Sequence, residues 1–288
     1  MNTDFNEKAG KDEEHFSLKR IIVRFFGFVL SLAMMISCSS AGYIFASGDL
    51  AAIGEKSYAK ISEAIAAAGE NDTVKLLPRA DGSPVYGCYT VSGKRNITID
   101  LNKATIEYRG ENNYLLKIEN SSVTIKNGTL NLQNAGSAVA VSGNSNVTFE
   151  NVTIKSAGRG VFVQSTGDTY IKVNSDTVIA SEKPSFYFGS EDASENITLD
   201  IFGKINSEKA SAIYNISKGK VKINLHGGSE IKAADVGIYN KESGFSLEMD
   251  GGLISGGTGI HSIGGKLTNR GAQDMTLYGI PFIILPFR

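Results

Sequence analysis

The sequence is poor in the residues that mark several classes of protein. Its 288 residues include no tryptophan, two cysteines and five prolines, and its 29 basic residues nearly cancel its 30 acidic ones. Two cysteines cannot supply a disulfide-stapled scaffold or a four-ligand zinc site, and a net charge of −1 argues against a nucleic-acid binder. Hydrophobic residues make up 41% of the chain, which excludes wholesale disorder. The 32 glycines lack the triplet period of collagen and therefore indicate many turns.

Residues 1–46 are predicted to form a polar segment followed by an export signal or a membrane anchor. Basic residues precede an almost wholly apolar run, residues 25–37, and small residues follow it at 38–41. This order is typical of a cleaved secretory signal. The stretch 25–46 is also long enough for an uncleaved anchor, and Cys38 resembles the acceptor cysteine of a lipoprotein signal. All three alternatives predict that the rest of the chain is exported.

One apolar position recurs down the chain at steps of 24 or 26 residues. It is occupied in turn by Ile97, Val123, Val147, Ile171, Ile197, Val221 and Phe245. Apolar and polar residues alternate around each position, as in Ile97-Thr98-Ile99, which is the pattern of a β-strand with one buried face. A second apolar column follows seven to ten residues later, at Ile106, Leu130, Ile154, Val178, Ile205, Ile231 and Ile254.

A third short strand completes each repeat. Three strands in each of about seven repeats of roughly 24 residues predict an all-β solenoid in which every coil stacks on the one before it. Asparagine tolerates the left-handed backbone of a sharp corner, so the recurrent asparagines are predicted to lie at corners. These are Asn127, Asn151, Asn215 and Asn240.

The segment 97–106 resembles part of a known family. It reads Ile-Thr-Ile-Asp-Leu-Asn-Lys-Ala-Thr-Ile and is similar to the ITIDLNGKTI segment of exported bacterial β-helix proteins, many of them adhesin-like, with Lys103 in place of the glycine. The repeats over residues 55–270 resemble the right-handed parallel β-helix of the pectin-lyase-like superfamily. The resemblance implies that a helix within 58–68 caps the open end of the first coil.

The predicted organisation has four parts. Residues 1–46 are the export segment, 47–78 an N-terminal cap of one helix and the first strand, and 79–270 the parallel β-helix. Residues 271–288 form an apolar tail that either caps the last coil or marks a truncation.

No catalytic, metal-binding or cofactor-binding residue is predicted. The outward positions of the first strand are Asp100, Lys126, Glu150, Asn174, Asp200, Asn224 and Glu248. Acids in this column stand two coils apart, about 9.6 Å, which is at or beyond the spacing of inverting glycosidases. Their alternation also avoids like charges on adjacent strands. The paired acids and the Gly-His-Gly of polygalacturonases are missing, and Cys88, with no histidine near it in sequence, is predicted to be a buried apolar residue.

The outward positions of the third strand suggest a binding function. They are Ala140, Phe162, Tyr187, Tyr214, Tyr239 and His261, so the last five are predicted to stack ring on ring along an exposed face. Exposed ring faces with hydroxyl edges suit sugar rings, although cross-strand aromatic pairs also stabilise a sheet that binds nothing.

The predicted function is therefore that of an exported, bacterial, secreted or cell-surface protein, adhesin-like and without catalysis. Its expected partner is a polysaccharide or a cell-surface glycan. Nucleic acid is not an expected partner, and a membrane is one only through an uncleaved N-terminal segment. The alternative is a polysaccharide lyase or glycoside hydrolase of the same fold.

Overall fold

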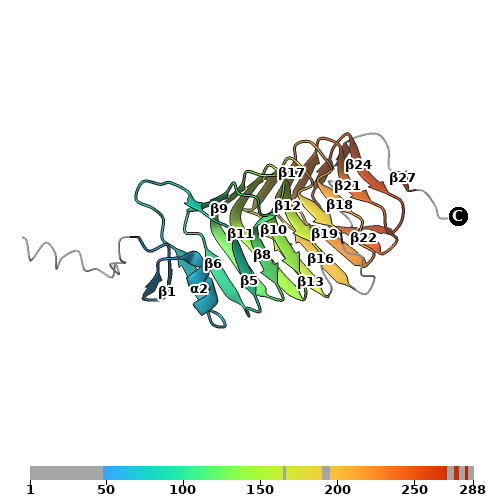
Figure 1. The fold of residues 1–288 in the computed structure, drawn as a ribbon. Coiled ribbons are helices and arrows are strands. Elements are labelled where there is room, and N and C mark those ends of the chain that lie inside the picture. Colours follow the sequence, from blue (N-terminus) through green and yellow to red (C-terminus); the bar gives the residue numbers. More distant parts are fainter. Residues whose placement is uncertain (1–47, 165–166, 190–194, 271–275, 279–282, 285–288) are drawn as a thin grey trace, which may run out of the picture. The chain divides into compact units, whose positions relative to one another are not determined.

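The chain from Ala46 onward forms one unit, a parallel β-solenoid of about eight turns, one more than the repeat count predicts (Figure 1). The computed structural model describes residues 48–164, 167–189, 195–270, 276–278 and 283–284, the last two only as strands. The whole predicted export segment, the first residue of the predicted cap and most of the predicted tail lie outside the described residues. Within the described ranges no helix has the length and apolar character that a membrane span requires.

Each coil contributes up to three strands, and equivalent strands of successive coils pair in parallel. The first strands are β3 (Thr73–Leu76), β6 (Ile97–Asp100), β9 (Ser122–Leu132), β11 (Ser145–Ser156), β13 (Thr169–Val173), β16 (Asn196–Ile201), β19 (Lys220–Leu225), β22 (Phe245–Met249) and β25 (Lys266–Asn269). The second strands are β4 (Val85–Tyr86), β7 (Thr105–Tyr108), the later halves of β9 and β11, β14 (Val178–Ser181), β17 (Lys204–Ser207), β20 (Glu230–Ala233), β23 (Leu253–Ser255) and β26 (Thr276–Tyr278).

The third strands form a separate sheet of nine strands. They are β5 (Tyr89–Ser92), β8 (Tyr114–Glu119), β10 (Ser137–Ser142), β12 (Arg159–Val163), β15 (Phe186–Phe188), β18 (Ile213–Asn215), β21 (Val236–Asn240), β24 (Thr258–Ser262) and β27 (Ile283–Ile284). The first and second strands belong together to a sheet of 18 strands, because β9 and β11 run through the corner without a break.

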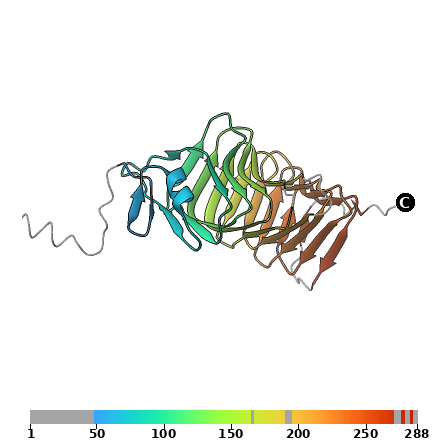
Figure 2. The same ribbon diagram turned by 60° about the horizontal axis from the view of Figure 1, so that its bottom comes forward.

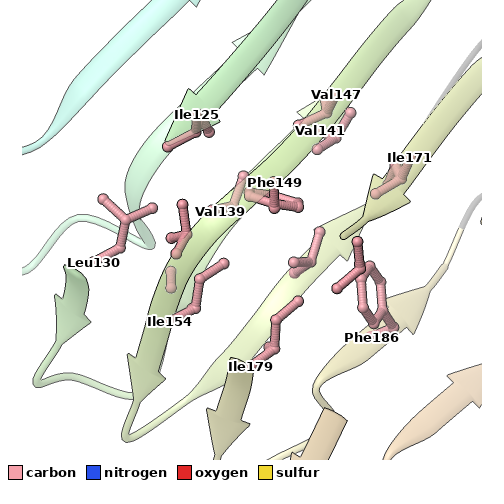
Figure 3. Close-up of a cluster of buried hydrophobic side chains, with 14 of the residues drawn as sticks. Ile125, Leu130, Val139, Val141, Val147, Phe149, Ile154, Ile171, Ile179 and Phe186 are labelled. Atoms are coloured by element: carbon pink, nitrogen blue, oxygen red, sulfur yellow. The ribbon is translucent and has the colours of Figure 1, made fainter. Parts of the chain in front are cut away.

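The hydrophobic core lies inside the coils. Alternate side chains of most described strands in the coils point inward, so the residues that Figure 3 labels converge from all three strand sets on one interior. Phe149, Phe186 and Phe188 are the largest fully buried side chains of the core. The core is therefore one continuous column of stacked aliphatic and aromatic layers, which each coil extends by one layer.

The first apolar column follows the predicted register from Ile97 to Ile171 and again from Ile197 to Phe245, but not at the step between Ile171 and Ile197. Val123 pairs with Val147, and Val147 with Ile171, but Ile171 then pairs with Leu199. Ile197, which the spacing placed above Ile171, pairs with Thr169. The predicted register is wrong by two residues at this step, because a shift of two leaves the inward and outward faces unchanged and the alternating pattern does not reveal it.

The second apolar column needs one correction of its own. Ile154 pairs with Ile179, which is fully buried, whereas the predicted member Val178 is 37% exposed. The chain turns this corner with the four residues between β13 and β14, whereas β9 and β11 pass their corners within a strand. The longer corner changes which of two adjacent apolar residues faces inward.

The recurrent asparagines serve two different purposes. Asn127 and Asn151 have φ angles of 61° and 52° and turn the corners of β9 and β11, as predicted. Asn215 and Asn240 are not at left-handed corners; both are fully buried at the inner face of the third-strand sheet. Nδ2 of Asn215 donates to Oδ1 of Asn240 at 2.7 Å, and Nδ2 of Asn240 donates to Oγ of Ser262 at 2.8 Å. These two asparagines therefore form a hydrogen-bonded ladder inside the solenoid.

The N-terminal end of the solenoid carries the predicted helix. It is α2 (Ile61–Ala67), beside the antiparallel pair β1 (Ala51–Ile53) and β2 (Lys56–Tyr58), and it lies at the same end of the coils in Figures 1 and 2. Its buried residues Ile61, Ala64 and Ile65 join the core. Nζ of Lys94, from the next coil, donates to the carbonyl oxygens of Ala66 and Ala68, at 2.8 Å each. A cation at these carbonyls complements the helix dipole.

Candidate functional site

The predicted aromatic column exists on the outer face of the third-strand sheet. Phe162 pairs with Tyr187, Tyr187 with Tyr214, Tyr214 with Tyr239, and Tyr239 with His261. We call these five residues the aromatic strip. Alternation places them outward, because both strand neighbours of each ring face the core.

Every strip residue is half-buried, and each is flanked by buried neighbours. In β15, for example, Tyr187 lies between Phe186 and Phe188, both fully buried. The strip is therefore one residue wide and is held on strands whose inner side chains are fixed in the core. Across four coil-to-coil steps it extends about 19 Å.

The rings of the strip stack mainly on one another. The centroids of Tyr187 and Tyr214 lie 5.4 Å apart with an interplanar angle of 17°, and those of Tyr214 and Tyr239 lie 5.0 Å apart with an angle of 10°. Phe162 and His261 are tilted against their neighbours, by 59° and 61°. The expectation of exposed ring faces is therefore not met in the middle of the strip, because neighbouring rings cover those faces. The edges and hydroxyl groups remain for a ligand.

The tyrosine hydroxyls of the strip make no bond within the described part of the chain. The hydroxyl groups of Tyr187, Tyr214 and Tyr239 form no hydrogen bond with any described residue. A phenol hydroxyl can both donate and accept. The strip thus carries three unused hydroxyl groups, one per coil.

Two cations lie over the strip. The guanidinium carbon of Arg159 is 4.6 Å from the ring centroid of Tyr187 and 5.5 Å from that of Phe162. Nζ of Lys241 is 6.0 Å from the centroid of Tyr239. Such contacts fix the cations near the rings and leave their N–H groups available as donors.

Gly189 gives the strip room. A Cβ at this position would lie 2.5 Å from Cε1 of Tyr187 and 3.3 Å from Cε2 of Phe162. No real Cβ approaches a ring carbon so closely, so the Tyr187 ring can lie over this backbone only because residue 189 is glycine.

The predicted column of acids is divided in two by the register shift. Asp100, Lys126 and Glu150 are aligned, and a separate alignment joins Asp200, Asn224 and Glu248 to Lys172. Acids still alternate with lysine or asparagine in both groups, so no two of these carboxylates stand on adjacent strands.

Most of these acids are bound to partners. The Asp200 carboxylate accepts from the Tyr170 hydroxyl at 2.6 Å and from Nδ2 of Asn224 at 2.5 Å. Burial and the hydrogen bond to Asp200 raise the pKa of Tyr170 to about 12. Glu248 forms ion pairs with Lys222 and Arg270, at 3.2 Å and 3.0 Å. The hydrogen bonds and ion pairs of Asp200 and Glu248 thus give both carboxylates a structural role.

Two grooves lie at corners of the solenoid. The larger, of about 520 Å³, has a lining rich in asparagine, serine and threonine, and we call it the amide groove. Its lining consists of Lys94, Arg95, Asn120, Ser121, Ser122, Asn144, Ser145, Asn146, Asp168, Thr169, Tyr170, Asn196 and Thr198. The smaller, of about 460 Å³, contains Glu150, Lys172, Asp176 and Phe202 together with amide side chains.

Sequence reasoning missed the amide groove, although a signal was present. Asn120 and Asn144 recur 24 residues apart, one coil, at the corner that follows the third strand. The recurrent asparagines were interpreted only as corner residues, and the pair at 120 and 144 was not among them.

Cys88 differs from its predicted environment, and His226 lies in a local contact network. Cys88 is half-buried and its Sγ accepts from Nδ2 of Asn112 at 3.0 Å, so it is not a buried apolar residue. His226 is partly covered: its ring stacks on Phe202 at 3.9 Å and its Nδ1 lies 3.0 Å from Oδ2 of Asp250. Among the residues described, no three histidine, cysteine, aspartate or glutamate side chains gather as a metal site would require.

Comparisons with protein-family models, curated proteins and solved structures find no match for this chain. The solenoid fold is therefore established from strand pairing and burial in the chain itself. The aromatic strip and the grooves are the features of the described surface that bear on function.

Proposed function

We propose that this chain is an exported, non-catalytic protein of the cell surface or the secreted fraction, adhesin-like, that binds glycans along the aromatic strip. The resemblance of its repeats to the pectin-lyase-like superfamily, and of residues 97–106 to exported bacterial β-helix proteins, supports this proposal. The apolar run within residues 1–46 supports export.

The unused tyrosine hydroxyls are the observation that carries the proposal. Tyr187, Tyr214 and Tyr239 present one hydroxyl per coil, on rings whose centroids are 5.0–5.4 Å apart. This repeat is similar to the length of one sugar unit in an extended glycan. A glycan lying along the strip could therefore pair one ring hydroxyl with each successive sugar.

Binding is expected through ring edges and hydroxyls, and less through ring faces. The central faces are stacked on each other, so a sugar cannot lie flat against them. Arg159 adds donors at one end of the strip and Lys241 near the other. The sheet itself is rigid, because its inner side chains are packed in the core, so little ordering is needed on binding.

A single chain should bind weakly. Three neutral hydrogen bonds of about 1 kcal/mol each correspond to a dissociation constant of several millimolar. Weak binding on an open face suits attachment by many copies on one surface, where effective concentration multiplies the affinity.

The test is a titration of the mature chain with a glycan panel, observed by NMR. The double variant Tyr214→Phe/Tyr239→Phe removes two hydroxyls and keeps the stacked rings, and it should weaken binding by about tenfold or more. The matched control is Tyr86→Phe, because Tyr86 is 55% exposed and lies on a second strand, away from the strip.

Two results would refute the proposal: no glycan of the panel binds, or the double variant binds as well as the control. Release of reducing or unsaturated ends from a glycan would instead support the alternative, a lyase or hydrolase. Glu150→Gln and Asp200→Asn would then identify the acids involved.

A further inference from the structure

The amide groove is separate from the aromatic strip. Its lining residues come from five successive coils, at the corner between the third strand of one coil and the first strand of the next. None of them belongs to the strip, which occupies the outer face of β12, β15, β18, β21 and β24. The groove is thus an elongated polar depression with a repeat of one coil, about 4.8 Å.

Most charged groups of the groove are already bound. Nζ of Lys94 donates to the carbonyls at the end of α2. The Asp168 carboxylate accepts from Nδ2 of Asn196 at 2.8 Å. Arg95 is exposed and has no ion-pair partner among the described residues. One available cation is too few for a polyphosphate chain, which needs several.

The amide side chains of the groove have unused donors. Oδ1 of Asn120 accepts from the backbone N–H of Asn144 at 3.2 Å, and Oδ1 of Asn144 accepts from that of Asp168 at 2.8 Å. Their oxygens are therefore occupied, while their NH₂ groups have no partner within the described residues. The side chain of Asn146 is exposed and makes no hydrogen bond there.

The backbone and the lining also disfavour a peptide ligand. The backbone N–H groups at this corner form hydrogen bonds between coils. The N–H of Ser145, for example, donates to the carbonyl oxygen of Asp168, and that of Asn146 to the carbonyl oxygen of Ser121. No free strand edge is therefore offered for β-augmentation. The lining includes no aliphatic side chain, so it gives a peptide side chain no apolar pocket.

We propose that the amide groove is a second binding site, for an uncharged, linear, polyhydroxylated chain such as a neutral polysaccharide. Neutral NH₂ and hydroxyl groups at a one-coil repeat match the hydroxyls of successive sugars. Tyr170, fixed by its bond to Asp200, contributes an aromatic wall within the groove. The site goes beyond the proposed function, because it lies at a different place from the strip and is restricted to neutral chains.

The experiment titrates the mature chain with four neutral hexasaccharides, namely cellohexaose, xylohexaose, mannohexaose and N-acetylchitohexaose, and with hexagalacturonate as the charged probe. At least one neutral chain should bind with little dependence on salt. Asn146→Leu should weaken that binding by about tenfold, the loss expected for one or two hydrogen bonds. Ser246→Leu is the matched control, because it also replaces a polar residue with leucine in the same outward column, four coils further on and outside the groove.

The strip variants separate this proposal from the proposed function. Tyr214→Phe/Tyr239→Phe should leave binding in the groove unchanged. Loss of neutral-glycan binding in this double variant, with full binding in Asn146→Leu, would overturn the groove and support the strip. The groove is equally refuted when no neutral hexasaccharide binds, when hexagalacturonate alone binds, or when the two leucine variants behave alike. If Asn146→Leu fails to fold, Asn146→Ser takes its place in each comparison, because it removes the amide and keeps a small polar side chain.

Discussion

Asn240 is the residue whose replacement best tests the interior of the solenoid. Its Oδ1 accepts from Nδ2 of Asn215 at 2.7 Å and from the backbone N–H of Glu242 at 3.2 Å. Its Nδ2 donates to Oγ of Ser262 and to the backbone oxygens of Glu242 and Gly264, at 2.8–3.0 Å. The side chain thus connects three successive coils, from β18 to β24.

Asn240→Ala removes this connection without adding a replacement. Two donors, Nδ2 of Asn215 and the N–H of Glu242, lose their acceptor. Asn215 is fully buried, so water does not readily take the place of that acceptor. The buried donor of Asn215 costs about 1–3 kcal/mol when it is orphaned, whereas water can reach the N–H of half-buried Glu242, so the free energy of unfolding should fall by about 1–3 kcal/mol.

The measurement is urea unfolding followed by circular dichroism, with Asn146→Ala as control. Asn146 is exposed and its side chain has no hydrogen bond among the described residues, so its replacement should change stability by less than about 0.5 kcal/mol. Because coils contact only their neighbours, hydrogen exchange should show the loss concentrated in β18, β21 and β24. Equal stability of the two variants would refute the reasoning that the amide ladder supports these coils.

Three further predictions follow from single contacts. Ile179→Ala should cost about 2–5 kcal/mol and Val178→Ala less than about 1 kcal/mol in urea unfolding, because only the first is buried; equal losses would contradict the observed register. Tyr170 holds its proton more tightly in the folded state, with a pKa of about 12, so its contribution to stability is complete below pH 10 and is lost as pH rises from 10 to 12. Tyr170→Phe should reduce this alkaline loss in urea titrations, and an unchanged loss would exclude Tyr170 as its source. Gly189→Ala should displace the ring of Tyr187, whose Cε1 would lie 2.5 Å from the added Cβ, and should shift the NMR signals of that ring. Unchanged signals would contradict the close approach.

Much of the fold could be predicted from the sequence, because each coil repeats the same alternation. Apolar residues two apart, such as Ile97 and Ile99, define a buried strand face, and the recurrence of this pattern at about one coil defines a solenoid. The aromatic strip could be predicted for the same reason. Each of its rings is an outward residue between two buried ones in a short strand, such as Tyr187 in β15, and such a strand leaves little freedom of register.

The roles of other residues depended on neighbours that lie one coil away. Asn127 and Asn240 occur in similar local sequences, yet the first turns a corner and the second is buried, because adjacent coils give it Asn215 and Ser262 as partners. The orientation of the strip rings depended likewise on the rings above and below them.

The sequence alone determined that this chain winds into stacked β-coils and that one row of rings lies outside them, since both follow from alternation within a strand. The tertiary structure decided that Ile171 is followed by Leu199, that ring edges rather than faces meet the solvent, and that amides line a groove. The reason is that alternation repeats every two residues and cannot distinguish registers two residues apart. Contacts between coils can, because each register brings different side chains together.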